Sequence, residues 1–365
     1  MGYQWVATEL LTGVQICDLN DLVTDQVLDT IGRYEIVNAT LPIPTAPPEW
    51  ERATMEGATA YYLLADNPGG GQPLIVWCGY IVDAQRDETD SISITLSTYP
   101  GYFDARYTGT RTYSQTGQND IVADLIANCV ADGPVGGIPI TVEYVTAGAG
   151  KLHDQSYADS DDKTVYSALQ DMMAWDGGPE WWVGGVWDGQ MLKPVLYVGD
   201  RIGSAADADG PNATFDLPGN SMSFQQIRSF AQGKGANAVM AYSSGQGDTR
   251  PQSPVQTIAD PDRPTFEYRW TPSTSILDQD TLTGYAVAAV AAMHNGAQSL
   301  TQSAIADQPE TPAYRVDWGL GDDVGFDIHT PSFPYGFSGT MRVLGMQLTL
   351  DNTRVITPVF LGSGS

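Results

Sequence analysis

Short runs of β-branched and aromatic residues, separated by turn-forming residues, dominate both ends of this 365-residue chain. The chain holds 39 glycines and 23 prolines, which favour turns between strands and interrupt long helices. One run, PLIVWCGYIVDA at 73–84, is apolar at nearly every position, which is typical of a strand covered on both faces. The pattern predicts a mainly β fold with an α+β insertion.

The insertion is indicated by a change of pattern in the middle of the chain. The segment 116–133 carries apolar residues at helical spacing. A second helix is expected after Ser160 as its N-cap, and two strands joined at Asp188-Gly189 follow, a residue pair favoured in type I′ turns. We therefore expect three domains: a β domain at 1–100, an α/β insertion of two helices and a hairpin at 101–200, and a second β domain at 201–365 with an inserted helix at 277–297.

The chain is strongly acidic, with 44 Asp and Glu against 17 Lys and Arg and a formal net charge of −27. Because affinity for nucleic acid comes mainly from Lys and Arg, this charge argues against binding DNA through its phosphates. It is compatible with a wall past which DNA moves without sticking. The first residues lack the features of a signal peptide, and the longest apolar stretch, 285–293, is too short to span a bilayer, so we expect synthesis in the cytoplasm and no membrane insertion.

No motif predicts a cofactor, a metal site or catalysis. The three cysteines are far apart and lack the paired spacing of a zinc site, and the three histidines are isolated. No order of Ser, His and Asp or of Cys and His stands out. We therefore expect a protein that is not an enzyme.

A tryptophan-rich stretch at 175–188 allows two interpretations. It interleaves four tryptophans with Asp176, Glu180 and Asp188, as a sugar-binding or sugar-hydrolysing surface could. Alternation along a strand instead places Trp181 and Trp182 on opposite faces, and at least one of them should meet the helix that carries Leu169 and Met172. We favour packing within the core or contact with a partner or another subunit, through Trp181, Trp182 and Trp187.

Several stretches resemble segments of one known family. They are QPLIVWCGYIVDAQRDETDSISITLSTYPGYFDARY, TYSQTGQNDIVADLIA, TVYSALQDMMAW with VWDGQMLKPVLYVGDRI, ILDQDTLTGYAVAAVAAM, and the strands WGLGDDVGFDI, MRVLGMQLTLD and VITPVF. In this order they resemble the baseplate hub, or minor tail protein, of long-tailed bacteriophages, most like those that infect actinobacteria. The resemblance is one of pattern and covers nearly the whole chain.

The resemblance implies two β-barrels like those of tail-tube proteins, flanking the helix–hairpin insertion. It further implies a homotrimer at the tail tip of the virion, which adapts the hexameric tail tube to the tip and surrounds the DNA-ejection channel. The implied partners are distal tail and tail-tube proteins, the tape-measure protein and tip or receptor-binding proteins, with DNA only in transit. Because the chain ends near Val359–Phe360, no lytic or receptor-binding domain is expected within it.

Two other functions stay open at this point. The stretch 175–188 could serve a carbohydrate-binding or cell-wall-degrading protein. A hexameric distal tail protein would share the barrel but have a different symmetry.

Overall fold

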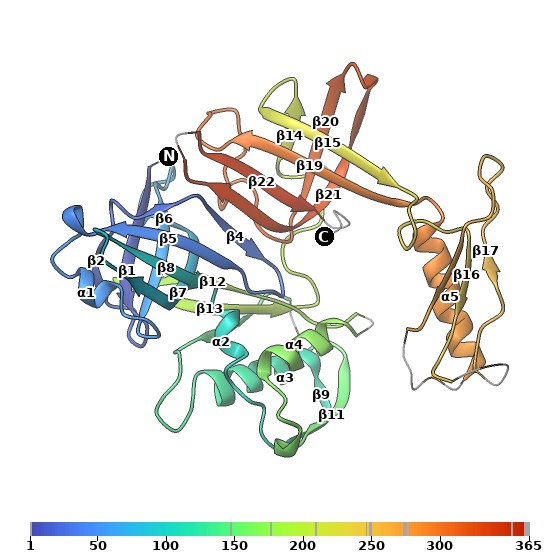
Figure 1. Ribbon diagram of the computed structural model, residues 1–365, viewed down its shortest axis with the longest axis horizontal. Coiled ribbons are helices and arrows are strands. Elements are labelled where there is room, and N and C mark those ends of the chain that lie inside the picture. Colours follow the sequence, from blue (N-terminus) through green and yellow to red (C-terminus); the bar gives the residue numbers. More distant parts are fainter. Residues whose placement is uncertain are drawn as a thin grey trace. The chain divides into compact units, whose positions relative to one another are not determined.

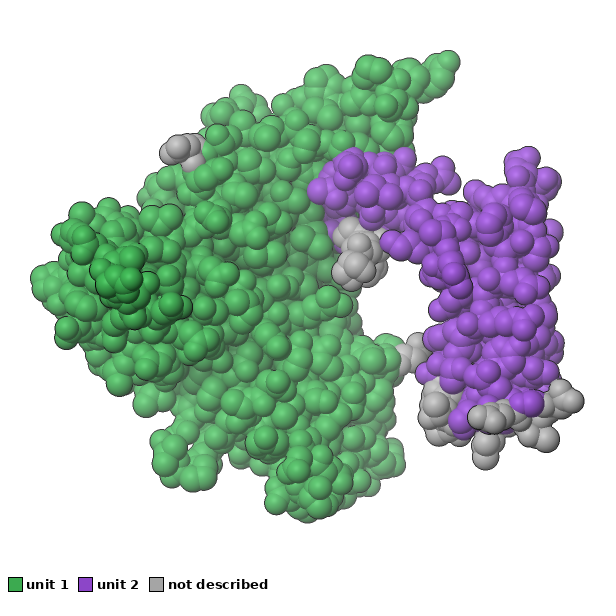
Figure 2. Space-filling model, viewed as in Figure 1, with its two compact units in different colours: residues 1–224, 302–359 green, residues 225–301, 360–365 purple. Residues whose placement is uncertain are grey.

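The computed structural model confirms the mainly β fold class, with 45% of the chain in strands and 15% in helices. It describes all residues except 1, 147, 176, 209, 246, 248, 249, 273–275, 277, 352 and 361–365. The chain forms two compact units, shown in different colours in Figure 2. The first comprises residues 1–224 and 302–359, and the second comprises residues 225–301 and 360–365. In the described part of the chain, no helix is both long and apolar enough to cross a bilayer.

The first unit begins with a seven-stranded sheet whose neighbouring strands are antiparallel. Its order is β2 (Gln15–Asp18), β1 (Tyr3–Glu9), β6 (Thr59–Ala65), β7 (Leu74–Arg86), β8 (Ser91–Ser97), β5 (Ile36–Pro42) and β3 (Val23–Thr24). Every residue of β6 is buried, and so are seven consecutive residues of β7, as the apolar run at 73–84 predicts. Three single-turn helices border the sheet: η1 (Ile43–Thr45), α1 (Trp50–Ala53) and α2 (Pro100–Phe103).

The insertion supplies two helices and a hairpin that pack against this sheet (Figure 1). Its elements are β9 (Arg111–Gly117), α3 (Gln118–Leu125), the π-helix η2 (Ile126–Val130), β10 (Thr141–Tyr144), β11 (Leu152–Tyr157), η3 (Asp159–Asp161), α4 (Val165–Met173), β12 (Glu180–Asp188) and β13 (Met191–Gly199). The turn between β12 and β13 consists of Gly189 and Gln190, because Asp188 pairs with Met191. The expected type I′ turn at Asp188-Gly189 is therefore wrong by one residue. Gly189, at φ +65°, takes the first central position, which suits a type II′ turn.

One continuous core joins the insertion to the first sheet. Buried side chains of β6 and β7 belong to the same cluster as those of α3, α4 and the hairpin β12–β13. The hairpin lies so close to the sheet that a Cβ on Gly185 would stand 2.8 Å from Ile75 and 3.0 Å from Tyr62. The Tyr62 hydroxyl also bonds to the Tyr99 hydroxyl at 2.7 Å and donates to the Leu192 carbonyl of β13 at 3.2 Å. The tryptophan-rich hairpin is thus an integral layer of the first unit.

A second seven-stranded sheet follows. Its path is β14 (Thr214–Leu217), β20 (Asp323–Thr330), β21 (Phe333–Thr349), β22 (Val355–Phe360), β19 (Ala297–Ile305) and β15 (Ser221–Ser229), with β4 (Gln26–Thr30) paired to β21 off this path. Among described residues, the first large sheet ends at β2 and β3, and the second ends at β14 and β15 with β4 as a further edge strand. The expected barrels are therefore not closed by hydrogen bonds.

The second unit has a small core of its own around α5 (Gln279–Met293). The helix lies along a three-stranded sheet of order β17 (Gln256–Thr257), β16 (Ala238–Ala241) and β18 (Glu267–Trp270) (Figure 1). It lies within the predicted range 277–297, and the Asp278 carboxylate caps it by accepting from the Thr281 N–H at 2.7 Å. The core consists of Leu282, Ala286 and Val290 of the helix, Val239 and Ala241 of β16, and Ala236 just before that strand.

Candidate assembly site around the tryptophan-rich hairpin

Trp181 lies in the interior, beneath α4. Its side chain is fully buried, its indole N–H points at the Leu169 carbonyl at 3.4 Å, and its ring lies 6.1 Å from that of Phe103. Its carbonyl accepts from the Gly32 N–H at 2.9 Å, which fixes β12 to the segment that follows β4. The contact with the helix of Leu169 and Met172 is the one that strand alternation predicts.

Trp182 points to the opposite face of β12 and is also buried. Its ring stacks on Tyr197 with centroids 5.4 Å apart and an interplanar angle of 13°, and the Arg315 guanidinium lies 5.0 Å from the ring centroid. The indole N–H donates to the carboxyl of Asp29 at 2.9 Å. Three distant parts of the sequence therefore meet at this one side chain.

Asp29 is a carboxyl group inside the protein. Burial raises its pKa to about 7, although the bond from Trp182 and the positive charge of Arg315 both act to lower it. Asp29 belongs to β4, where Val27, Leu28 and Asp29 pair with Leu348, Gln347 and Met346 of β21. The buried carboxyl of Asp29 therefore lies at the junction between the two large sheets, where β4 pairs with β21.

Trp187 differs from its two neighbours because it is only half-buried. Its indole N–H donates to the Pro73 carbonyl at 2.9 Å, and its ring lines two surface cavities. Of the three predicted contact residues, Trp181 and Trp182 form core contacts within the chain. A contact with a partner or another subunit through this hairpin remains a prediction, and Trp187 is the residue placed to make it.

The acidic residues of the stretch do not form a free catalytic pair. Glu180 is ion-paired with Arg342, and Asp188 is ion-paired with Lys193 at 2.6 Å. Asp176 lies outside the described residues. Within the described ranges, no group of three His, Cys, Asp or Glu side chains is arranged to hold a metal ion.

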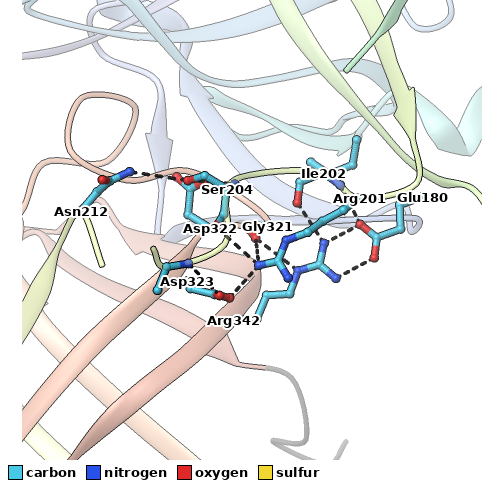
Figure 3. A network of polar contacts seen from close by, with 10 residues as sticks. Glu180, Arg201, Ile202, Ser204, Asn212, Gly321, Asp322, Asp323 and Arg342 are labelled. Atoms are coloured by element: carbon cyan, nitrogen blue, oxygen red, sulfur yellow. Dashed lines mark hydrogen bonds and ion pairs between the residues drawn. The ribbon is translucent and has the colours of Figure 1, made fainter. Parts of the chain in front are cut away.

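Glu180 and Arg342 form the centre of a polar network that fixes the end of the hairpin to the second sheet (Figure 3). Arg342, from β21, donates from both terminal nitrogens to the Glu180 carboxylate, once at 2.6 Å, and its Nε donates to the Gly321 carbonyl at 3.2 Å. Glu180 also accepts from the Ile202 N–H at 2.7 Å. Both side chains are more than four-fifths buried, so the pair is protected from solvent screening.

The segment after β13 is clamped beside this ion pair. Arg201 donates to Asp323 at 2.6 Å and to the Gly321 carbonyl at 3.1 Å. Burial acts to raise the pKa of Asp323, but bonds from the Ala206 N–H and from Arg201 outweigh it and hold the pKa below its usual value. A Cβ on Gly321, which has φ +86°, would overlap the Ile202 carbonyl oxygen. The backbone at Ile202 and the backbone at Gly321 can therefore come this close only because glycine has no Cβ.

Sequence reasoning did not identify Asp29, Arg315 or Arg342. One signal was available for Asp29, since it lies two residues after Val27 in a short strand where every second residue is buried. A carboxyl at such a position indicates a special environment. Arg315 and Arg342 carry no comparable local signal, because their partners lie far away in the sequence.

Comparison with known proteins gives a fold assignment without a sequence family. No protein-family model matches the chain, and no curated protein gives a significant match. Three solved structures resemble it over 99% of its length. They are the tail protein from Neisseria meningitidis MC58 (14% identity, 96% of that chain, TM-score 0.61), the tail protein of prophage MuSo2 from Shewanella oneidensis (12%, 98%, 0.60) and a prophage tail protein from Listeria monocytogenes EGD-e (10%, 95%, 0.52). The chain has the fold of these phage tail proteins.

Proposed function

We propose that this chain is a structural protein of a bacteriophage tail, specifically the baseplate hub at the distal tip. Three copies form a ring that adapts the hexameric tail tube to the tip and surrounds the channel through which DNA leaves. The ring contacts distal tail or tube proteins on one side and tip proteins on the other. The likeness in fold to phage tail proteins over almost the whole chain supports a role in the tail.

One observation carries the finer proposal. A single chain supplies two seven-stranded sheets, and β4 joins them by pairing with β21. The Glu180–Arg342 pair adds a buried polar link between the hairpin and the second sheet. Three such chains would present six β-sheet units in a closed ring, which matches a sixfold tube with one gene product.

The charge of the chain agrees with this position. A net charge of −27 would repel DNA from the wall of a channel, so that the nucleic acid passes without being held. The carbohydrate-binding alternative is weakened, because Trp181 and Trp182 are buried and their faces are already occupied. Of the four tryptophans in the stretch, a sugar could reach only Trp175 and Trp187, which are partly exposed.

Counting the copies of the chain in purified particles tests the proposal. Quantitative mass spectrometry with isotope-labelled standards would compare this chain with the tail-tube protein of the same particles. A hub predicts three copies per tail. Six copies would favour the distal tail alternative, and absence from the particle would overturn a role in the virion.

A further inference from the structure

Trp187 separates two adjoining cavities on the first unit. The first has a volume of about 510 Å³, and the second has a volume of about 470 Å³. Trp187 and Gln72 line both of them. We call this two-part surface the Trp187 groove. Its first cavity is also lined by Ile75, Val186, Arg315, Val316, Asp317 and Asp322, and its second cavity by Val14, Gln15, Gln190 and Met191.

Arg315 is the one cationic residue among the described residues that line the first cavity, which Asp317 and Asp322 also line. Its backbone has φ +70°, a conformation that is rare outside glycine, and its guanidinium lies over the ring of Trp182. Among the described residues, no hydrogen bond or ion pair joins this guanidinium to an acceptor. Arg342 and Arg201, by contrast, are both paired with carboxylates. A half-buried guanidinium retains donors that a carboxylate would fit in a bidentate manner.

The carboxylates in the same wall are already engaged by backbone groups. Asp317 accepts from the Ala313 N–H at 2.7 Å. Asp322 accepts from the N–H groups of Ser204 at 2.6 Å and Gly319 at 2.7 Å. These bonds hold the two acids in place, and neither acid is paired with Arg315, whose charge also acts on the buried carboxyl of Asp29. With two acids and one arginine, the wall does not suit the repeated phosphates of a nucleic acid.

The second cavity has a different character, since its walls are neutral and partly apolar. Val14 is 47% exposed, and Met191 lies beside it in the lining. A ligand that spans both cavities must therefore be extended, with an acidic group at one end and an apolar group at the other. Tryptophan and arginine are also the side chains that most often dominate the energy of protein interfaces.

We propose that the Trp187 groove binds an extended acidic peptide segment of another protein, with an Asp or Glu carboxylate on Arg315 and a neighbouring apolar side chain across Trp187 in the second cavity. This site is independent of the ring that the chain forms, so it extends the proposed function and does not rest on it.

Selection from a random decapeptide library on the immobilised full chain, by mRNA display, tests this site. Enriched peptides would be labelled with fluorescein and titrated by fluorescence anisotropy against wild type, Arg315→Gln and Arg52→Gln. Arg52 is a matched control, because it is an arginine of the same unit that pairs with Glu9 on the surface and lines neither cavity. We expect acidic peptides whose affinity falls at least about tenfold in Arg315→Gln and is unchanged in Arg52→Gln.

A second variant covers the case in which Arg315→Gln does not fold. Val316 is 51% exposed, so Val316→Asp should fold normally while it places a competing carboxylate beside Arg315. Val316→Asp should weaken the binding of the same peptides by a similar factor. Replacing the Glu of a peptide by Gln should remove the difference in affinity between wild type and this variant. Enrichment of peptides without acids, peptide binding that both variants leave unchanged, or failure to enrich any peptide would overturn the proposal. A parallel array of uronic-acid oligosaccharides that binds through Arg315 in place of peptides would also overturn it.

Discussion

The buried Asp29 makes a quantitative prediction about stability and pH. In the folded protein its pKa is raised from 3.8 to about 7, chiefly by burial. Between these values the folded chain holds a proton that the unfolded chain has lost, so the folded state binds more protons. The contribution of protonated Asp29 to the stability of the fold is therefore complete below about pH 4 and is lost as the pH rises through 7. The sign is opposite to that of a carboxylate stabilised by a surface ion pair.

The size of the effect follows from the two pKa values. Each pKa unit corresponds to about 1.4 kcal/mol, so the full difference is about 4 kcal/mol, of which about 2.6 kcal/mol falls between pH 5 and pH 8. Asn at position 29 resembles the protonated carboxyl and still accepts from the Trp182 indole N–H, but it cannot ionise. Asp29→Asn should therefore match wild type below about pH 4, exceed it by about 1.7 kcal/mol at pH 5 and exceed it by about 4 kcal/mol at pH 8. For a chain of this length the further gain of about 2.6 kcal/mol between pH 5 and pH 8 corresponds to about 3 °C in Tm.

Thermal unfolding of wild type and Asp29→Asn in matched buffers at pH 5, 6, 7 and 8 would measure this. Asp25→Asn is the control, because it removes an exposed carboxyl from the residue just before β4 and should leave the pH profile as in wild type. Other groups titrate equally in all three proteins, so only the difference between profiles matters. A difference between wild type and Asp29→Asn that is the same at pH 5 and pH 8 would refute the buried, protonated state of Asp29.

Three further predictions concern the junction and the core beneath α4. Arg342→Met leaves Glu180 buried without its cation and should lower the free energy of unfolding by about 3 kcal/mol in urea titrations. A loss below about 1 kcal/mol would contradict a stabilising ion pair between Glu180 and Arg342. Gly321→Ala should abolish soluble expression or cost more than about 3 kcal/mol, whereas Gly57→Ala, at φ +66° with nothing within 4 Å, should cost only about 1 kcal/mol of backbone strain. Trp181→Ala should cost about 3–5 kcal/mol in the same assay, and an unchanged urea midpoint would place this residue outside the core.

Local features were predictable from the sequence because their determinants are close together in the chain. The longer strands of the first sheet, the helix at 277–297 and the hairpin after α4 all follow from periodicity and turn residues. The N-cap of α4 was placed wrongly, at Ser160. Residues Asp159–Asp161 form a 3-10 turn, Asp162 adopts φ +47°, and Thr164 is the true cap, since its hydroxyl accepts from the Ser167 N–H at 3.1 Å. Several residues of this segment could cap a helix, and tertiary contacts select among them.

The junction could not be predicted, because it joins residues that are far apart in the sequence. Gln26 and Gln347 bond across 321 positions, and Glu180 and Arg342 across 162. Nothing in the pattern of β4 shows that it leaves the first sheet for the second. The strand β17 beside α5 was also missed, since it has only two residues. Such short segments acquire their structure from the core that they help to form.

In the proposed hub, one chain provides two β-sheet units of a threefold ring. Cryo-electron microscopy of the assembled particle, scored for symmetry at the tail tip, would test this arrangement. We expect a ring of three copies in which six β-sheet lobes surround the channel, with β4 and β21 paired inside every copy. A ring of six copies, or a β4 that pairs with a neighbouring copy in place of its own β21, would contradict it.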